Sequence, residues 1–233
     1  MTPTAGAAAF VTKVSGIRNL TDSTYALRFD RGNLDFEPGQ YVSVGVRGDI
    51  DMREYSIYSS PGDDYLEILV KEIEHGYVSS RLRALTSGAE IEIEGPFGFF
   101  TIDAEVRRSD TLLFIATGTG ISPFHSLVRA YPGLDYQLLH GVRTLEERYD
   151  HAVFDPTRIV ACVSREPIDG RGGAESSASN LFQGRVTDFV RLRPPRCDTY
   201  CYLCGNCDMI YETFDILKGH GVAPGQLFAE VYF

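Results

Sequence analysis

Residues Thr111 to Phe124 read TLLFIATGTGISPF, and this stretch decides the fold of the second half of the chain. An apolar run ends at Ala116, glycines follow at positions 118 and 120, and we expect Ser122 to be the N-cap of a helix whose first residue is Pro123. We therefore expect a buried strand, a glycine turn and a helix, which together present backbone N–H groups to a phosphate. A plain strand-to-helix connection also fits this stretch, so the rest of the chain has to decide.

The pattern that begins with this strand continues to the end of the chain. Near-continuous apolar runs alternate with segments of helical periodicity, which is typical of a parallel sheet covered by helices. A stretch rich in Gly, Ser and Ala, 169–180, predicts a mobile loop. The expected strands are 111–117, 136–140, 158–163, 199–204 and 227–232, and the expected helices are 123–130, 186–192 and 208–218.

The first hundred residues follow a different pattern. Short runs with alternating polarity, separated by turn residues, predict an antiparallel β-barrel interrupted by one helix at 78–85. The pattern changes between 105 and 110, so we expect two domains, 1–105 and 106–233. The expected barrel strands are 10–17, 23–29, 40–46, 53–59, 65–70 and 89–94.

Composition narrows the classes of function. The formal charge of −10, from 32 acidic and 22 basic residues, disfavours nucleic acid as a partner. No apolar run approaches the ~20 residues that span a bilayer, and the first nine residues lack the features of a secretory signal. The five cysteines are odd in number and do not suggest a disulfide framework. We expect a cytoplasmic protein with reduced thiols and no membrane partner.

Two segments of the first domain carry residues suited to a ligand. Arg53-Glu54-Tyr55-Ser56 lies on an expected strand, where successive side chains point to opposite faces. Arg53 and Tyr55 therefore share one face and Ser56 lies on the other, although a plain barrel strand also fits. The segment 76–80 can present backbone N–H groups and hydroxyls to an anion at the start of a helix. Its candidate residues are Gly76, Val78, Ser79 and Ser80.

Taken with the glycine turn, these residues resemble the ferredoxin–NADP reductase family, which includes the reductase components of bacterial oxygenases. The resemblance implies an antiparallel FAD-binding barrel followed by a parallel-sheet NADP-binding α/β domain. Tyr55 would lie against the isoalloxazine ring of FAD, Ser56 would stand near flavin N5, and Arg53 would pair with the pyrophosphate. Ser79 and Ser80 fall where the family has further phosphate contacts.

The resemblance extends through the second domain. Residues 117–124 match the family's nicotinamide-nucleotide turn, and Cys204-Gly205-Asn206 matches its segment beside the nicotinamide. The chain ends Glu230-Val231-Tyr232-Phe233, where the family has a carboxylate followed two residues later by an aromatic over the flavin; this spacing favours Tyr232, although Phe233 could stack instead. The implied nucleotide-binding residues are Thr117, Gly118, Thr119, Gly120, Pro123, Cys204, Gly205 and Asn206, and the implied catalytic residues are Ser56, Cys204, Glu230 and Tyr232.

The choice between NADP and NAD depends on what meets the adenosine ribose, because a 2′-phosphate requires guanidinium groups and a free hydroxyl pair favours a carboxylate. Arg143, the pair Ser164-Arg165, and Arg185 each stand near the end of an expected parallel-sheet element. They resemble the arginines that bind the 2′-phosphate in bacterial members. NADP(H) is therefore preferred to NAD(H), unless these are ordinary surface arginines.

The cysteines also fit another motif. Cys197, Cys201 and Cys204 have the spacing of a radical-SAM iron–sulfur site. On a strand, however, Cys201 and Cys204 would lie on opposite faces and roughly 10 Å apart, too far to share one cluster. The five histidines show no zinc-site spacing. We expect no metal.

The resemblance implies an enzyme, an FAD-dependent flavoprotein oxidoreductase. It would transfer hydride from NADPH to FAD and then pass electrons singly to a ferredoxin, a flavodoxin or an oxygenase component. Two alternatives stay open: an NAD(P)H:flavin reductase that uses free flavin as its substrate, and a non-enzymatic electron-relay subunit. The net charge of −10 would repel an acidic ferredoxin at long range, unless a local basic patch docks it.

Overall fold

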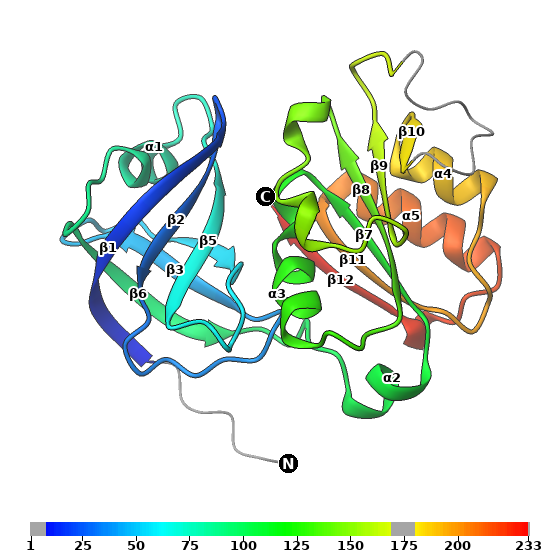
Figure 1. Ribbon diagram of the computed structural model, residues 1–233, viewed down its shortest axis with the longest axis horizontal. Helices are drawn as coiled ribbons and strands as arrows, with labels where there is room; N and C mark the ends of the chain where they lie inside the picture. The colour runs from blue at the N-terminus through cyan, green and yellow to red at the C-terminus, as the bar shows by residue number, and fades with distance from the viewer. Residues whose placement is uncertain (1–7, 169–179, 233) are drawn as a thin grey trace. The chain divides into compact units, whose positions relative to one another are not determined.

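The computed structural model describes residues 8–168 and 180–232 (Figure 1). Most of the predicted loop 169–180, and Phe233, lie outside the described residues. The described residues divide into two compact units: the first contains residues 8–101 and 122–131, and the second contains residues 102–121, 132–168 and 180–232. Among the described residues, no helix is long and apolar enough to cross a bilayer.

The first unit is built on a six-stranded antiparallel sheet with the order β4-β3-β6-β1-β2-β5 (Figure 1). A bridge between Ile57 and Ile68 joins the chain after β4 to β5, and so links the two edge strands of the sheet. The predicted antiparallel barrel is confirmed. Its strands are β1 (Ala8–Thr21), β2 (Thr24–Asp30), β3 (Tyr41–Val46), β4 (Arg53–Ser56), β5 (Tyr65–Lys71) and β6 (Glu90–Phe97).

Alternation along these strands builds the core of the first unit. Val42 and Val44 of β3, and Ile91 and Ile93 of β6, are fully buried in one hydrophobic cluster, because every second side chain of a strand faces the same side. Helix α1 (Tyr77–Arg83) lies against β3 and β2 and adds Val78 and Leu82 to this cluster.

Helix α3 (Ser122–Ala130) packs with the first unit although it follows the glycine turn in sequence. The His125 ring stacks on Tyr58 with ring centroids 3.8 Å apart, and His125 Nδ1 lies 2.7 Å from the Tyr58 carbonyl oxygen. Arg129 donates two hydrogen bonds, of 2.7 and 2.8 Å, to the carboxylate of Asp63. The segment directly after β4 is therefore bonded to the helix directly after the glycine turn.

The start of this helix differs from the prediction. Ser122 was expected to cap the helix, but the 3₁₀ turn η1 (Gly118–Ile121) runs straight into α3, so Ser122 is its first residue. The glycine turn itself is helical, which leaves no extended residue at position 122 to act as a cap.

The second unit contains six parallel strands in the order β10-β9-β8-β7-β11-β12. The chain builds outward from β7 to β10 and then returns to place β11 on the other side of β7. The predicted parallel sheet is confirmed, and its strand order reverses beside β7. The strands are β7 (Leu112–Thr117), β8 (Tyr136–Val142), β9 (Ile159–Val163), β10 (Leu181–Gln183), β11 (Tyr200–Asn206) and β12 (Leu227–Tyr232).

The two faces of this sheet differ. Helices α4 (Val186–Leu192) and α5 (Cys207–Gly219) cover one face and share a hydrophobic cluster with it (Figure 1). The other face carries a row of aromatic rings across four adjacent strands, with centroids 4.6 to 6.1 Å apart. The rings of this row are Tyr136, Phe114, Tyr202 and Phe228.

Several short elements of the structure are not predicted by the sequence pattern. Helix α2 (Ala104–Ser109) occupies the stretch expected to be a plain boundary, and β10 has only three residues. Elements this short do not show a recognisable hydrophobic period. The remaining short elements are the 3₁₀ turns η2 (Leu145–Glu147), η3 (His151–Val153) and η4 (Pro224–Gln226).

Candidate cofactor sites

Strand β4 positions the first group of candidate residues. It pairs with β3 so that Tyr55 lies opposite Val42 and Ser56 lies opposite Tyr41. Arg53 is exposed, and its Nη1 donates a hydrogen bond of 2.7 Å to the Met52 carbonyl. Tyr55 is half-buried against the core cluster and Ser56 is buried. One short strand therefore offers a cation, an aromatic ring and a hydroxyl.

The phenol of Tyr25, a residue of β2, connects β2 with α1. Its hydroxyl donates a hydrogen bond of 2.6 Å to the Ser79 carbonyl oxygen. Burial, and next the charge of Tyr55, raise the pKa of Tyr25, while burial raises the pKa of Tyr55 to about 12 against the opposing charge of Arg53. Both phenols are therefore neutral at neutral pH. Tyr25 is not among the residues predicted from the sequence, because an aromatic residue in an alternating strand is typical of an ordinary core.

The turn into α1 is tight. A Cβ on Gly76 would lie 2.8 Å from Ser79 Oγ and 2.9 Å from the Ile73 carbonyl oxygen. Ser79 is buried and its hydroxyl accepts a hydrogen bond of 3.3 Å from Ile73 N–H, while Ser80 is half-buried. The side chain of Val78 belongs to the core, so only its backbone is available to a ligand. The ring of Tyr55 fits a flavin, and the guanidinium of Arg53 with the N-terminus of α1 fits its pyrophosphate.

The carboxyl ends of β7, β11 and β12 bring a second group together. Cys204 lies opposite Ala116 on one side and Glu230 on the other, and Asn206 lies opposite Tyr232. The Thr117 hydroxyl accepts a hydrogen bond of 3.0 Å from Asn206 N–H. The candidate residues of the glycine turn therefore lie beside the candidate residues of β11 and β12.

Glycines allow this close approach. A Cβ on Gly120 would lie 2.3 Å from the Cys204 carbonyl oxygen, and one on Gly205, where φ is +126°, would lie 2.4 Å from Thr117 Oγ1. A Cβ on Gly118 would meet nothing within 4 Å, although its φ of +54° favours glycine. The turn is thus closed towards β11 and open at Gly118. An open turn of backbone groups at the carboxyl edge of a parallel sheet fits a pyrophosphate.

Several side chains of this group already have partners. Asn206 caps α5, since its Oδ1 accepts a hydrogen bond of 3.2 Å from Met209 N–H. Ser164 donates a hydrogen bond of 3.1 Å to the Val142 carbonyl, and Thr119 is half-buried. Pro123 is buried in α3, which packs with the first unit.

Cys204 is a neutral thiol in this environment. Burial and then the charge of Glu230 raise its pKa well above the usual range, against the opposing effect of a side-chain hydrogen bond with Tyr232. Three candidate residues on β11 and β12 therefore form one cluster of a thiol, a carboxylate and a phenol. A thiol that stays protonated is a poor nucleophile, so this environment does not activate Cys204 for covalent chemistry.

Three exposed arginines stand along the other half of the same edge. Arg143 follows β8, Arg165 follows β9 and Arg185 follows β10, three neighbouring strands of the sheet. Within residues 8–168 and 180–232, no ion pair or side-chain hydrogen bond engages their guanidinium groups. The spacing between adjacent strands is about 4.8 Å, so the three backbone positions span roughly 10 Å. Such a group of unpaired cations fits a phosphate.

His140 is a residue of this region that the sequence analysis missed. It ends a buried run in β8, and its Nε2 lies 2.9 Å from the Gly118 carbonyl oxygen of the glycine turn. The signal was available, because a polar residue at the carboxyl end of a buried parallel strand is a common ligand-site position.

The cysteines separate as the strand geometry predicts. Cys201 packs in the hydrophobic cluster that the sheet shares with α4 and α5, whereas Cys204 makes a side-chain hydrogen bond with Tyr232. In the part of the chain that the structure describes, no three His, Cys, Asp or Glu side chains gather closely enough to hold a metal ion.

Thiol reactivity should follow this burial. Burial raises the pKa of Cys201 to about 12 and raises the pKa values of Cys162 and Cys204, whereas Cys197 is exposed and Cys207 is half-buried. We expect a disulfide reagent such as DTNB to modify two thiols rapidly in the native protein and all five after denaturation. Rapid modification of Cys204 in the native state would contradict its assignment as a buried thiol.

Comparison with known proteins agrees with this architecture. Residues 11–102 match the family model of the oxidoreductase FAD-binding domain. The flavodoxin/ferredoxin–NADP reductase of Escherichia coli (strain K12) is 31% identical over 220 residues, which cover 86% of each chain. The toluate 1,2-dioxygenase electron transfer component of Pseudomonas putida is 28% identical over 238 residues, covering 97% of this chain and 68% of that protein.

A solved structure shows the same fold. The ferredoxin NADP+ reductase from Neisseria gonorrhoeae, crystallised with bound FAD and NADP, superposes with a TM-score of 0.83 at 22% identity and covers 97% of this chain and 99% of its own. The likeness therefore covers both the barrel and the parallel sheet. With nearly a third of its residues identical to the Escherichia coli reductase over most of both chains, this chain belongs to the ferredoxin–NADP reductase family.

Proposed function

We propose that this chain is an FAD-dependent NADPH oxidoreductase that delivers electrons to a protein acceptor. Bound FAD would take a hydride from NADPH and release the two electrons singly. The names of the relatives support the class of acceptor, since they include flavodoxin/ferredoxin reductases and an electron transfer component of an oxygenase. A ferredoxin, a flavodoxin or an oxygenase component is the partner proposed here.

The first 105 residues are the proposed FAD-binding domain. Arg53 would compensate the charge of the FAD pyrophosphate, together with backbone N–H groups of the turn at Gly76 and the hydroxyls of Ser79 and Ser80. The half-buried ring of Tyr55 would lie against the isoalloxazine. The Ser56 hydroxyl would donate a hydrogen bond near flavin N5.

Residues 106–233 are the proposed NADPH-binding domain. The turn from Thr117 to Gly120 would hold the pyrophosphate, and Arg143, Arg165 and Arg185 would hold the 2′-phosphate. Cys204 and Glu230 would border the nicotinamide. Tyr232 would supply the aromatic ring that shields the flavin, while Phe233 stays an alternative for that role.

The observation that carries this proposal is the composition of the carboxyl edge of the parallel sheet. One half of the edge holds the nucleotide turn beside the Cys204, Glu230 and Tyr232 cluster, and the other half holds three exposed guanidinium groups. Cations without carboxylate partners favour NADPH over NADH, because the extra phosphate is the only group that distinguishes these two nucleotides. The protein's contribution is to bind and orient, since the chemistry belongs to the cofactors.

The absorption spectrum of the purified protein tests the proposal. After extensive dialysis the protein should retain a flavin spectrum, which NADPH should bleach at lower concentration than NADH. Loss of all flavin on dialysis with retained activity on added flavin would favour the free-flavin reductase. A flavin that NADPH does not reduce would favour the electron-relay subunit.

We also propose a cytoplasmic location. The five cysteines form no disulfide among the described residues. Free thiols of this number are typical of proteins in reducing compartments.

A further inference from the structure

Two imidazoles, one buried and one half-buried, form a hydrogen-bonded chain that ends on the glycine turn. His140 is fully buried at the end of β8, and its Nε2 lies 2.9 Å from the Gly118 carbonyl oxygen. Its Nδ1 lies 2.8 Å from Nε2 of His151 in η3. Gly118, His140 and His151 are therefore joined in one line of hydrogen bonds within the second unit.

The chemistry of the Gly118 carbonyl assigns the protons along this line. A carbonyl oxygen can only accept, so His140 Nε2 carries a hydrogen and donates it to Gly118. In a neutral imidazole the other nitrogen then accepts, so His151 Nε2 must donate to His140 Nδ1. Each ring thus has one defined tautomer.

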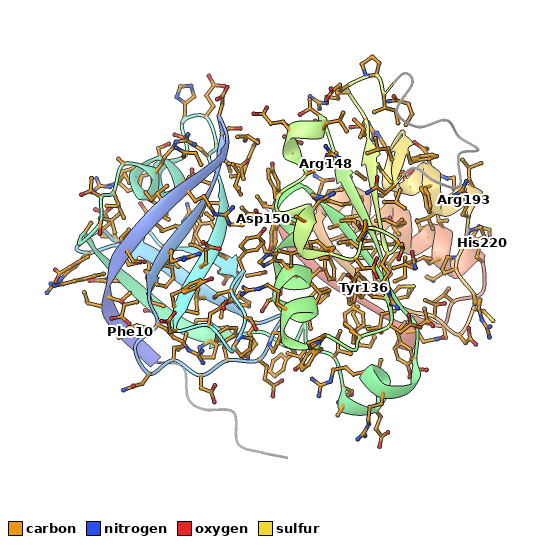
Figure 2. The ribbon with its side chains drawn as sticks, viewed as in Figure 1. Phe10, Tyr136, Arg148, Asp150, Arg193 and His220 are labelled. Carbon is orange, nitrogen blue, oxygen red and sulfur yellow. The ribbon has the colours of Figure 1, made fainter. Side chains whose placement is uncertain are left out.

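The surroundings keep both rings neutral. Burial lowers the pKa of His140 to about 4, against the effects of the Gly118 carbonyl and Glu147. Burial, followed by the charges of His140 and Arg148, lowers the pKa of His151 as well, and Asp150 opposes them. Arg148 and Asp150 come from the segment between η2 and η3 and are labelled in Figure 2. Near neutral pH the pair is uncharged, so its hydrogen bonds keep the direction described above.

Gly118 is a residue whose peptide needs such a partner. Its φ of +54° is accessible to glycine, and among the described residues no heavy atom outside the turn's own backbone and the two neighbouring residues lies within 4 Å of the position that a Cβ would take, so side-chain packing does not hold this residue. A peptide unit is planar and trans, so its C=O and the following N–H point in opposite directions. A Gly118 carbonyl directed at His140 therefore directs the N–H of Thr119 away from the imidazole.

We infer that His140 and His151 are positioning residues for the nicotinamide nucleotide, because they set the orientation of the peptide between Gly118 and Thr119 on which the pyrophosphate would rest. This inference rests on the proposed function. His140 does not touch the nucleotide in this view; it acts through the backbone of the turn, and His151 acts through His140.

Paired variants of His140 test the inference. His140→Phe removes the donor to Gly118, and we expect the KM for NADPH and the Kd for NADP+ measured by calorimetry to rise about tenfold. The value of kcat should change less than about twofold, since the bond is the same in the ground and transition states. His140→Gln can still donate from Nε2, so it should restore both constants to within about threefold of wild type.

The second imidazole supplies a further test with a matched control. His151→Phe keeps an aromatic ring but removes the donor to His140, and should raise the Kd for NADP+ about threefold. The control is His220→Phe, at an exposed histidine after α5 that Figure 2 labels, and it should leave the Kd unchanged. Nitrogen-15 spectra of the imidazoles should show hydrogen on Nε2 of both His140 and His151.

The outcomes separate this inference from the proposed function. A wild-type protein that neither binds NADP+ nor oxidises NADPH refutes both. If the wild-type protein binds NADP+ and oxidises NADPH, two results overturn the inference alone. One is a folded His140→Phe variant whose KM for NADPH and Kd for NADP+ are unchanged. The other is a His140→Gln variant that raises these constants as much as His140→Phe does. If His140→Phe does not fold, His151→Phe decides, and a Kd equal to that of His220→Phe overturns the inference.

Discussion

Replacing Gly120 with alanine is expected to lower kcat/KM for NADPH by at least about 100-fold, because a displacement of about 1 Å at a binding turn can cost that much. The new Cβ would lie 2.3 Å from the Cys204 carbonyl oxygen and 2.8 Å from the Gly205 Cα, and both neighbours are backbone atoms that cannot rotate away. The turn must move off β11 to relieve this overlap. Overpacking of this kind also destabilises the fold by about 1–3 kcal/mol.

The matched control for this variant is Gly133→Ala. A Cβ at Gly133 meets nothing within 4 Å, and this glycine does not have the positive φ that would strain an alanine. Activity and unfolding free energy should therefore stay close to wild type. Steady-state kinetics with NADPH and thermal unfolding of both variants check the prediction. An active Gly120→Ala protein would show that the contact between the turn and β11 does not position the nucleotide.

Removing two of the arginines at the sheet edge should reverse the nucleotide preference. In the double variant Arg143→Ala/Arg165→Ala we expect kcat/KM for NADPH to fall about 10²–10⁴-fold, since each charge-assisted hydrogen bond contributes about 1.5–3 kcal/mol. The value for NADH should change little, because NADH has no 2′-phosphate. Both guanidinium groups are exposed and neither has an ion pair among the described residues, so the fold should keep its stability.

Net charge is the main alternative explanation for such a result. The double variant Arg193→Ala/Arg196→Ala removes the same charge from another exposed part of residues 106–233, where Arg196 pairs with Asp198. Figure 2 labels Arg193. This control should retain its NADPH preference at every salt concentration. Equal losses in both double variants would mean that these arginines act only through the overall electrostatic field.

The hydrophobic pattern predicted those helices and strands that are long enough to show a hydrophobic period. The helix Val186–Leu192 and the strand Leu227–Tyr232 were predicted with the bounds that the structure shows. The glycine turn was also recognised, because its chemistry depends on residues adjacent in sequence. The three-residue β10 was missed, since no period can appear in so short a segment.

The sequence by itself determined the two kinds of sheet, the glycine turn and the candidate arginines, because hydrophobic periodicity and turn chemistry are properties of neighbouring residues. Only the tertiary structure decided which of these residues meet. Strand order places β8, β9 and β10 side by side and so aligns Arg143, Arg165 and Arg185. It also sets β8 beside β7, where His140 reaches Gly118 across 22 positions of sequence. Contacts of this range depend on how strands pair, and no local pattern encodes that pairing.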